Sequence, residues 1–422
     1  MVESAPQLTL TKSSALYEEA QRLSPGGLMG IRRPYNFVPG EYPIFLESGH
    51  GGHIVDVDGN DYIDMLCAYG PIILGYVEPE INDAVKAQMD KGFCFSLVQP
   101  LQNALEAKLI EIIPSAQKVI LVKTGSDATS VATRIARGYT DRDVILRCGY
   151  HGWHDWAVEV NGGVPDAIAD LTVEFPYGDL PALEALLTQY ADRAACVIIT
   201  PVGHPLAKPV MAPPEGYLQG VRELADTFGV VLIFDEIRSG FRVALGGAQE
   251  RYGVTPDLST FGKAMANGYA ISAVVGKDEI MSVAEGKVFI SSTFFPNSLE
   301  MAAALKTIEI LQRDRVIEQV WEKGTWFLDA LTETVRASGV PVSVSGIPPM
   351  PFLTFEKVDE HAKARRELFY TQTIRRGLFV QPYHHWYVSA RHTQEDLEAA
   401  IAAIRDALAI VAQTFPYAGE RG

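Results

Sequence analysis

The amino-acid sequence predicts an α/β fold built on a mainly parallel sheet, together with a smaller α+β domain. Short apolar runs alternate with helical patterns through the middle of the chain, as in proteins made of strand–helix–strand units. These runs are apolar at successive positions, which is typical of strands buried on both faces. The C-terminal part of the chain lacks this alternation, and the change predicts the second domain.

Five apolar runs are predicted as strands of the sheet. Between the first two, Ala128, Val131, Ala132 and Ile135 follow the spacing i, i+3, i+4, i+7, which predicts a helix with one apolar face. The predicted strands are KVILV (118–122), DVILR (143–147), ACVIIT (195–200), VVLIFD (230–235) and AISAVVG (270–276).

Domain limits follow from the same patterns. Residues 65–305 carry the strand–helix alternation and form the predicted large domain, and residues 306–422 form the small one. In the small domain a Thr393-x-x-Asp396 capping box predicts the start of a long terminal helix. Residues 1–64 contain Asp58-Gly59-Asn60, which predicts a hairpin turn, and we expect them to pack with the small domain.

Composition excludes several classes of protein. The 422 residues are 47% hydrophobic with a net charge of −16, which argues against a nucleic-acid partner because phosphate binding needs clustered Lys and Arg. No apolar run is long enough to cross a bilayer, and the N-terminus lacks a secretory pattern. The four cysteines are scattered, and His384 and His385 lack a third ligand at suitable spacing. We therefore expect a cytoplasmic protein without a membrane partner, metal site or disulfide.

Chemically informative residues follow several of the predicted strands. Lys263 comes after a short apolar run, and it is either part of a surface turn or kept for covalent chemistry. Asp235 ends a strongly apolar strand, where a buried carboxylate needs a partner; it either caps the next turn or faces a cation. Tyr150, after another strand, either packs in the core or lies against a planar ring.

A possible anion site precedes the predicted helix at 127–137. Gly125 allows close backbone approach, and the helix start offers free N–H groups to an anion. Thr124 and Ser126 add hydroxyl donors, although this pattern is also that of a helix cap. Because ligands gather at the carboxyl ends of parallel strands, these features combine into one site. A phosphate cradle, a ring stack, an anion for a ring nitrogen and an amine for an aldehyde are what pyridoxal 5′-phosphate requires.

Over nearly its whole length the sequence resembles the class III family of pyridoxal-phosphate aminotransferases (fold type I), particularly its glutamate-1-semialdehyde aminomutase-like branch. The resemblance implies a mainly parallel seven-stranded sheet in the large domain and a homodimer with both active sites at its interface. It is carried by SPGG (24–27), VDGNDYID (57–64), YGPIILGY (69–76), TGSDAT, RIARGYTDRD, YHG, DEIRSGFR, PDLSTFGKAMANG and VSARHT (388–393).

The resemblance assigns roles to individual residues. Lys263 would be the Schiff-base lysine, and Asp235 would pair with the pyridinium nitrogen. Gly125 and Ser126 would hold the phosphate, helped by Thr293 from the neighbouring subunit. The other cofactor-binding residues would be Thr124, Tyr150 stacked on the ring, His151, Ile237 on the opposite ring face, and His204.

Substrate contacts are expected from Arg33, which would grip a carboxylate unless it forms a structural ion pair, and from the aromatic Tyr69 and Trp153. The chain also departs from the family pattern. Thr200-Pro201 replaces a common Glu-Pro, His204 stands near a usual Asn, and Arg238 occupies a position that is commonly uncharged. These changes lie near the expected cofactor and its entrance, so we expect them to alter substrate choice.

The predicted function is transfer of an amino group from an amino acid, with L-glutamate as the expected donor, to an aldehyde or ketone. Resemblance to enzymes that aminate sugars suggests an amino-sugar or related biosynthetic intermediate as the acceptor. The alternative on the same site is an isomerase, namely an aminomutase, racemase or epimerase. A non-catalytic cofactor-binding protein is the third interpretation, and the presence of both Lys263 and Asp235 argues against it.

Overall fold

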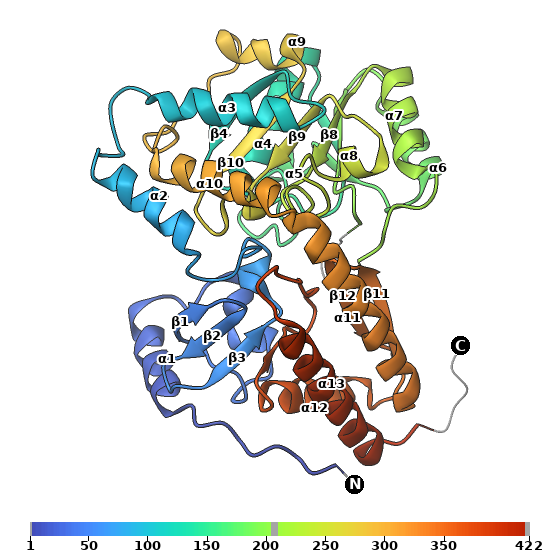
Figure 1. Cartoon of the computed structure of the whole chain (residues 1–422). Coiled ribbons are helices and arrows are strands. Elements are labelled where there is room, and N and C mark those ends of the chain that lie inside the picture. The colour runs from blue at the N-terminus through green and yellow to red at the C-terminus, as the bar shows by residue number, and fades with distance from the viewer. Residues whose placement is uncertain (1, 204–209, 418–422) are drawn as a thin grey trace. The chain divides into compact units, whose positions relative to one another are not determined.

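The computed structural model describes residues 2–203 and 210–417, which form two compact units. One unit is built mainly from residues 79–317, and the other from residues 2–78 and 318–417 (Figure 1). The first unit contains the sequence stretch with the predicted strand–helix alternation. The second combines segments from both ends of the chain. The domain limits inferred from the sequence stay a prediction.

The first unit contains a seven-stranded sheet in the order β4-β10-β9-β8-β7-β5-β6. Strand β10 is antiparallel to both of its neighbours, and the other neighbouring pairs are parallel, so the predicted mainly parallel sheet is confirmed. The strands are β4 (Lys118–Val122), β5 (Val144–Cys148), β6 (Thr172–Glu174), β7 (Ala194–Ile199), β8 (Val231–Asp235), β9 (Leu258–Phe261) and β10 (Ser272–Gly276).

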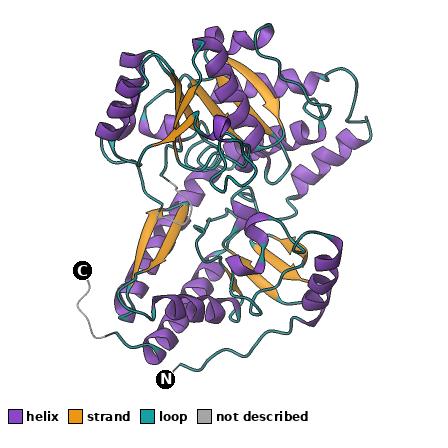
Figure 2. Cartoon of the chain, turned by 180° about the vertical axis from the view of Figure 1, so that it is seen from behind, coloured by secondary structure: helices purple, strands orange, loops and turns teal. Residues whose placement is uncertain are grey.

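Helices pack on both faces of this sheet (Figure 2). In β5, Val144 and Leu146 join one apolar core, while Ile145 between them joins the other. Burial on both faces is the reason that these strands are apolar at every position. The helices are α2 (Pro79–Met89), α3 (Pro100–Ile112), α4 (Gly125–Thr140), α5 (Asp166–Ala169), α6 (Leu180–Gln189), α7 (Tyr217–Phe228), α8 (Ala248–Tyr252), α9 (Asp278–Met281) and α10 (Leu299–Arg313).

The second unit holds a four-stranded sheet, β1-β2-β3-β13, and a hairpin of β11 and β12. The predicted turn at Asp58-Gly59-Asn60 joins antiparallel β2 and β3, and Gly59 has a φ of 92°. Thr393 and Asp396 form the predicted capping box of α13. The elements are α1 (Thr11–Leu23), β1 (Leu46–His50), β2 (His53–Asp56), β3 (Asp61–Asp64), α11 (Val316–Ser338), β11 (Val342–Ile347), β12 (Met350–Phe355), α12 (Ala362–Ile374), β13 (Leu378–Phe379) and α13 (Gln394–Thr414). Among the helices described, none is both long and apolar enough to cross a membrane.

A buried carboxylate organises the loop that follows β8. Glu236 is fully buried, and it accepts hydrogen bonds from the backbone N–H groups of Ala248 (2.8 Å) and Gln249 (2.9 Å) and from the hydroxyl of Ser239. Gly247 has a φ of 84°, and a Cβ there would lie 2.6 Å from the Glu236 carboxylate. Glycine is therefore required for this close approach. The contacts fix the segment that carries Ile237 and Arg238.

Replacing Glu236 by alanine is expected to lower the free energy of unfolding by about 3 kcal/mol or more, because three buried donors lose their acceptor. Urea unfolding followed by circular dichroism would measure the change. The control is Glu223→Ala, which removes an exposed carboxylate from α7. Equal unfolding midpoints for the two variants would contradict the role given to Glu236.

Candidate active site

The candidate site lies where strands of the seven-stranded sheet end. Strands β4, β5, β7, β8 and β9 point the same way, so their carboxyl ends share one edge of the sheet (Figure 1). Thr124, Tyr150, Thr200 and Lys263 follow four of these strands, and Asp235 is the last residue of the fifth. The parallel topology therefore collects residues that are far apart in the sequence.

Lys263 is held in an unusual position directly after β9. Its φ is 45°, a left-handed conformation that is uncommon for a residue with a side chain and costs on the order of 1–3 kcal/mol. Gly262 before it allows close packing, since a Cβ there would lie 2.6 Å from the Ser272 hydroxyl and 3.2 Å from Ile237. Burial, with a smaller contribution from the positive charge of Arg238, lowers the pKa of Lys263 to about 7 against the opposing effect of Asp235. The amine is thus partly unprotonated near neutral pH.

Asp235 is buried at the end of β8 and makes a hydrogen bond with buried His151. The distance from Asp235 Oδ2 to His151 Nδ1 is 2.8 Å. Asp235 Oδ1 accepts two longer bonds of 3.2 Å, from the Ile237 backbone N–H and from the Thr260 hydroxyl. His151 is itself fixed by Thr129, whose hydroxyl donates to the His151 carbonyl (2.7 Å). These contacts stabilise a carboxylate in a place where an unpaired one would be costly.

Two buried polar atoms in this region have no hydrogen-bond partner within the described residues. They are Nε2 of His151 and Oγ1 of Thr200, which follows β7. Buried polar groups are normally paired, so each is open to a ligand. The Thr200 side chain also lies against the turn after β5, because a Cβ on Gly149 would be 2.4 Å from its hydroxyl.

The predicted anion-binding turn has the form of a helix cap. Thr124 is the N-cap of α4, and its hydroxyl accepts from the Asp127 N–H (3.1 Å) and donates to the Asp127 carboxylate (2.8 Å). The capping alternative for Thr124 is therefore present in the structure. The Ser126 hydroxyl accepts from the Trp153 N–H (3.3 Å), and a Cβ on Gly125 would lie 3.1 Å from Ile237. Phosphate binding by Gly125 and Ser126 stays a prediction.

Aromatic and cationic groups lie beside these residues. Tyr150 is half-buried, and the Arg238 guanidinium carbon is 5.9 Å from the centre of its ring. Burial raises the pKa of Tyr150, and Arg238 partly offsets this. Trp153 is 69% exposed, so its side chain forms part of the surface. Arg238 thus contributes positive charge near both Tyr150 and Lys263.

Thr293, Arg33, Tyr69 and His204 are the remaining predicted site residues. Thr293 is exposed, and its role toward a neighbouring subunit stays a prediction. Arg33 and Tyr69 belong to the other compact unit, where the Arg33 Nε donates to the Leu28 carbonyl (3.1 Å). Burial raises the pKa of Tyr69 to about 12. His204 lies outside the described residues.

Sequence reasoning missed two contacts of this site. Thr260 was not predicted to contact Asp235, although a threonine within an apolar strand was a usable signal. His151 was assigned to the cofactor site without its hydrogen bond to Asp235, because pairing between the ends of β5 and β8 depends on sheet order.

Comparison with known proteins identifies the family. Residues 37–408 match the aminotransferase class-III family. The chain is 58% identical to 3-aminobutyryl-CoA aminotransferase of Cloacimonas acidaminovorans, over 96% of this chain and 99% of the relative. It is 34% identical to glutamate-1-semialdehyde 2,1-aminomutase of Natranaerobius thermophilus, over 95% and 99% of the two chains.

Among solved structures, the chain resembles the PLP internal aldimine form of the Sphingopyxis sp. MTA144 FumI protein, with a TM-score of 0.91 and 30% identity over 96% of this chain and 97% of that one. An omega-transaminase from Sphaerobacter thermophilus gives a TM-score of 0.87 and 29% identity over 94% and 97% of the chains. The fold is thus that of the fold type I enzymes, as the sequence predicted. With a family match over most of its length and relatives that are similar from end to end, this chain belongs to the class-III aminotransferase family.

Proposed function

We propose that the protein is a pyridoxal-phosphate-dependent aminotransferase that uses Lys263 and Asp235 at the strand ends of the seven-stranded sheet. The observation that carries this proposal is the pairing of an amine of lowered pKa, at Lys263, with a buried carboxylate held by His151. Pyridoxal phosphate requires both groups in one site: a reactive amine for its aldehyde and a fixed anion for its pyridine nitrogen.

The residues of the site fit this cofactor. The unpartnered Nε2 of His151 and Oγ1 of Thr200 offer polar contacts to its substituents. Asp235 would keep the ring nitrogen protonated, and Lys263 would bind the aldehyde. Ring contacts are proposed for Tyr150 and Ile237, and phosphate contacts for Thr124, Gly125 and Ser126 of this chain and Thr293 of a second copy.

When bound, pyridoxal phosphate supplies an electron sink for the carbon that carries the substrate amine. Lys263 would then act as general base, removing a proton from that carbon and returning it during the second half-reaction. This task requires an unprotonated amine near neutral pH, which agrees with a pKa of about 7. Arg238 favours the unprotonated amine because it places a second positive charge nearby.

The proposed substrate is 3-aminobutyryl-CoA or a closely related β-amino acyl thioester. Support comes from the relative of that name, which is 58% identical and similar over nearly its whole length. Its amino group would pass to a 2-oxo acid such as 2-oxoglutarate, so that the products are 3-oxobutyryl-CoA and L-glutamate. In reverse, L-glutamate is the donor and a ketone the acceptor, as proposed from the sequence. An amino-sugar acceptor stays a competing proposal.

The second candidate function is isomerisation by an aminomutase. Relatives named glutamate-1-semialdehyde 2,1-aminomutase are 34% identical over 95% of this chain. In an aminomutase the amino group returns to the same carbon skeleton, so no second substrate is consumed. We also propose a cytoplasmic homodimer with a biosynthetic role, and light scattering would test the dimer.

Replacing Lys263 by alanine is expected to abolish the visible absorption band that lysine-bound pyridoxal phosphate gives, because the substitution removes the amine that would hold the aldehyde. In wild type, L-glutamate should convert this band to that of the pyridoxamine form. The control is Lys91→Ala, an exposed lysine of the same unit. If wild type reconstituted with the cofactor shows no such band, the proposed role of Lys263 is wrong.

The rate of cofactor binding to the apoprotein should follow the protonation of Lys263. Only the neutral amine attacks an aldehyde, so the rate should rise with pH through about 7 and then level off. Arg238→Met should move this midpoint to higher pH, because the positive charge that disfavours the ammonium is removed. Arg238→Lys retains a charge and serves as the control. Identical midpoints for wild type and Arg238→Met would show that Arg238 does not influence the amine.

Steady-state kinetics should separate the candidate substrates. With 2-oxoglutarate as acceptor, we expect kcat/KM for 3-aminobutyryl-CoA to exceed that for free 3-aminobutyrate by at least about tenfold, because the free acid lacks the binding energy of the thioester group. L-Glutamate formation provides the assay. A higher kcat/KM for an amino sugar would refute the thioester proposal. Conversion of glutamate-1-semialdehyde without a second substrate would favour the aminomutase.

A further inference from the structure

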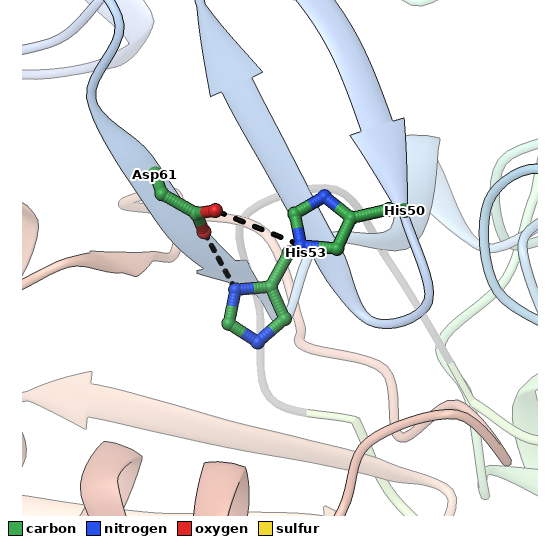
Figure 3. Close-up of side chains that lie close together, drawn as sticks. All are labelled: His50, His53 and Asp61. Atoms are coloured by element: carbon green, nitrogen blue, oxygen red, sulfur yellow. Dashed lines mark hydrogen bonds and ion pairs between the residues drawn. The ribbon is translucent and has the colours of Figure 1, made fainter.

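A cluster of two histidines and one aspartate lies on the four-stranded sheet, in the unit that does not contain Lys263. His50 ends β1, His53 begins β2 and Asp61 begins β3 (Figure 3). One imidazole nitrogen from each histidine and one carboxylate oxygen lie within 4.8 Å of one another. Both histidines point toward Asp61, with N–O distances of 2.6 Å for His53 and 3.6 Å for His50.

The backbone fixes this arrangement. The two-residue turn Gly51-Gly52 places His50 directly opposite His53 in the β1–β2 register, with the two rings stacked at a centroid distance of 5.3 Å. In the β2–β3 register, Asp61 lies opposite Val55, two residues from His53 along the strand and therefore on the same face. The cluster is thus a consequence of strand pairing.

A second carboxylate orients His53 from the other side. Asp396 Oδ1 lies 3.0 Å from His53 Nε2, while its Oδ2 accepts from the Thr393 N–H (2.8 Å) in the capping box of α13. Because a carboxylate only accepts, each of the two His53–carboxylate contacts needs a proton on the imidazole nitrogen or a metal ion in its place. The Nδ1 atom faces the Asp61 carboxylate at 2.6 Å, and a metal ion there would leave the Nε2 proton to Asp396.

The donors match the requirements of a zinc ion. Zn²⁺ binds imidazole nitrogen and carboxylate oxygen at about 2.0–2.2 Å, so tetrahedral ligands lie about 3.3 Å apart. One nitrogen of each histidine and one Asp61 oxygen lie within 4.8 Å of one another, so small side-chain shifts would bring the three donors to this spacing. The His50 side chain is 63% exposed and the Asp61 side chain 49%, so each has room to adjust and water can complete the coordination. The carboxylate–histidine pair of Asp396 and His53 is the outer contact that metal-ligating histidines usually make.

We propose that His50, His53 and Asp61 bind a divalent transition-metal ion, preferably Zn²⁺, and that Asp396 orients His53. The ion would link three strands from the N-terminal part of the chain and, through Asp396, the start of α13 from the C-terminal part. It would stabilise this unit without taking part in amino transfer. Mg²⁺, which prefers oxygen ligands in octahedral geometry, would not bind there.

Equilibrium dialysis of the holoenzyme against zinc chloride tests the proposal, in a reducing buffer that contains neither chelator nor phosphate. The number of Zn²⁺ ions bound per chain should be higher by one in wild type than in His50→Ala or Asp61→Asn. The matched control is His361→Ala, which removes another exposed histidine and should behave as wild type. Asp396→Asn should weaken zinc binding by about 10–100-fold. The visible band of the bound cofactor would confirm that each variant is folded.

Thermal unfolding gives an independent measurement. Zinc chloride should raise the unfolding midpoint of wild type and His361→Ala and leave that of His50→Ala unchanged. Magnesium chloride should not raise the midpoint of any of the three proteins. Equal zinc stoichiometry in wild type and His50→Ala would overturn the proposal, and so would an unchanged midpoint in wild type. Either result would mean that only a proton lies between His53 and Asp61.

Discussion

The burial of Asp235 at the end of β8 is the constraint on which the candidate site depends. A carboxylate removed from water without partners would cost several kcal/mol, so the surrounding residues must satisfy it. His151, from the neighbourhood of β5, and Thr260, on β9, both bond to it. Asp235 and Thr260 lie on β8 and β9 and His151 follows β5, and only the sheet order brings them together. The fold and the charge of the site are therefore linked through one side chain.

Close backbone approach is the second requirement, and glycine meets it where a side chain could not. Ile237, two residues after Asp235, packs against both Gly125 and Gly262. A Cβ added to Gly125 would lie 3.1 Å from the Ile237 side chain, and one added to Gly262 would lie 3.2 Å from it. Gly125 is the first residue of α4, directly before Ser126, and Gly262 directly precedes Lys263. A single isoleucine thus sets the spacing between the start of α4 and the lysine. Larger residues at either glycine would push these segments apart.

The sequence predicted the parallel sheet well because strands buried on both faces are apolar throughout, and runs such as 118–122 match β4. Strand β6 (Thr172–Glu174) was not predicted, since it lies at the sheet edge and is too short to form an apolar run. Site chemistry was inferred from strand ends, but pairings such as His151 with Asp235 depend on tertiary structure. The grouping of His50 with Asp61 was missed for the same reason, because strand register and not sequence spacing brings them together.

The charges around Lys263 fit the two roles proposed for it, those of covalent anchor and of base. Burial lowers its pKa first, because the ammonium loses hydration, and the positive charges of Arg238 and Arg242 act in the same direction. Asp235 opposes them, so the pKa settles at about 7 instead of falling further. A site with the aspartate alone would retain the ammonium, and a site without it would lose the partner for a ring nitrogen. Arg238 is therefore best understood as a counterweight to Asp235, because it favours a neutral amine beside a strong anion at one edge of the sheet.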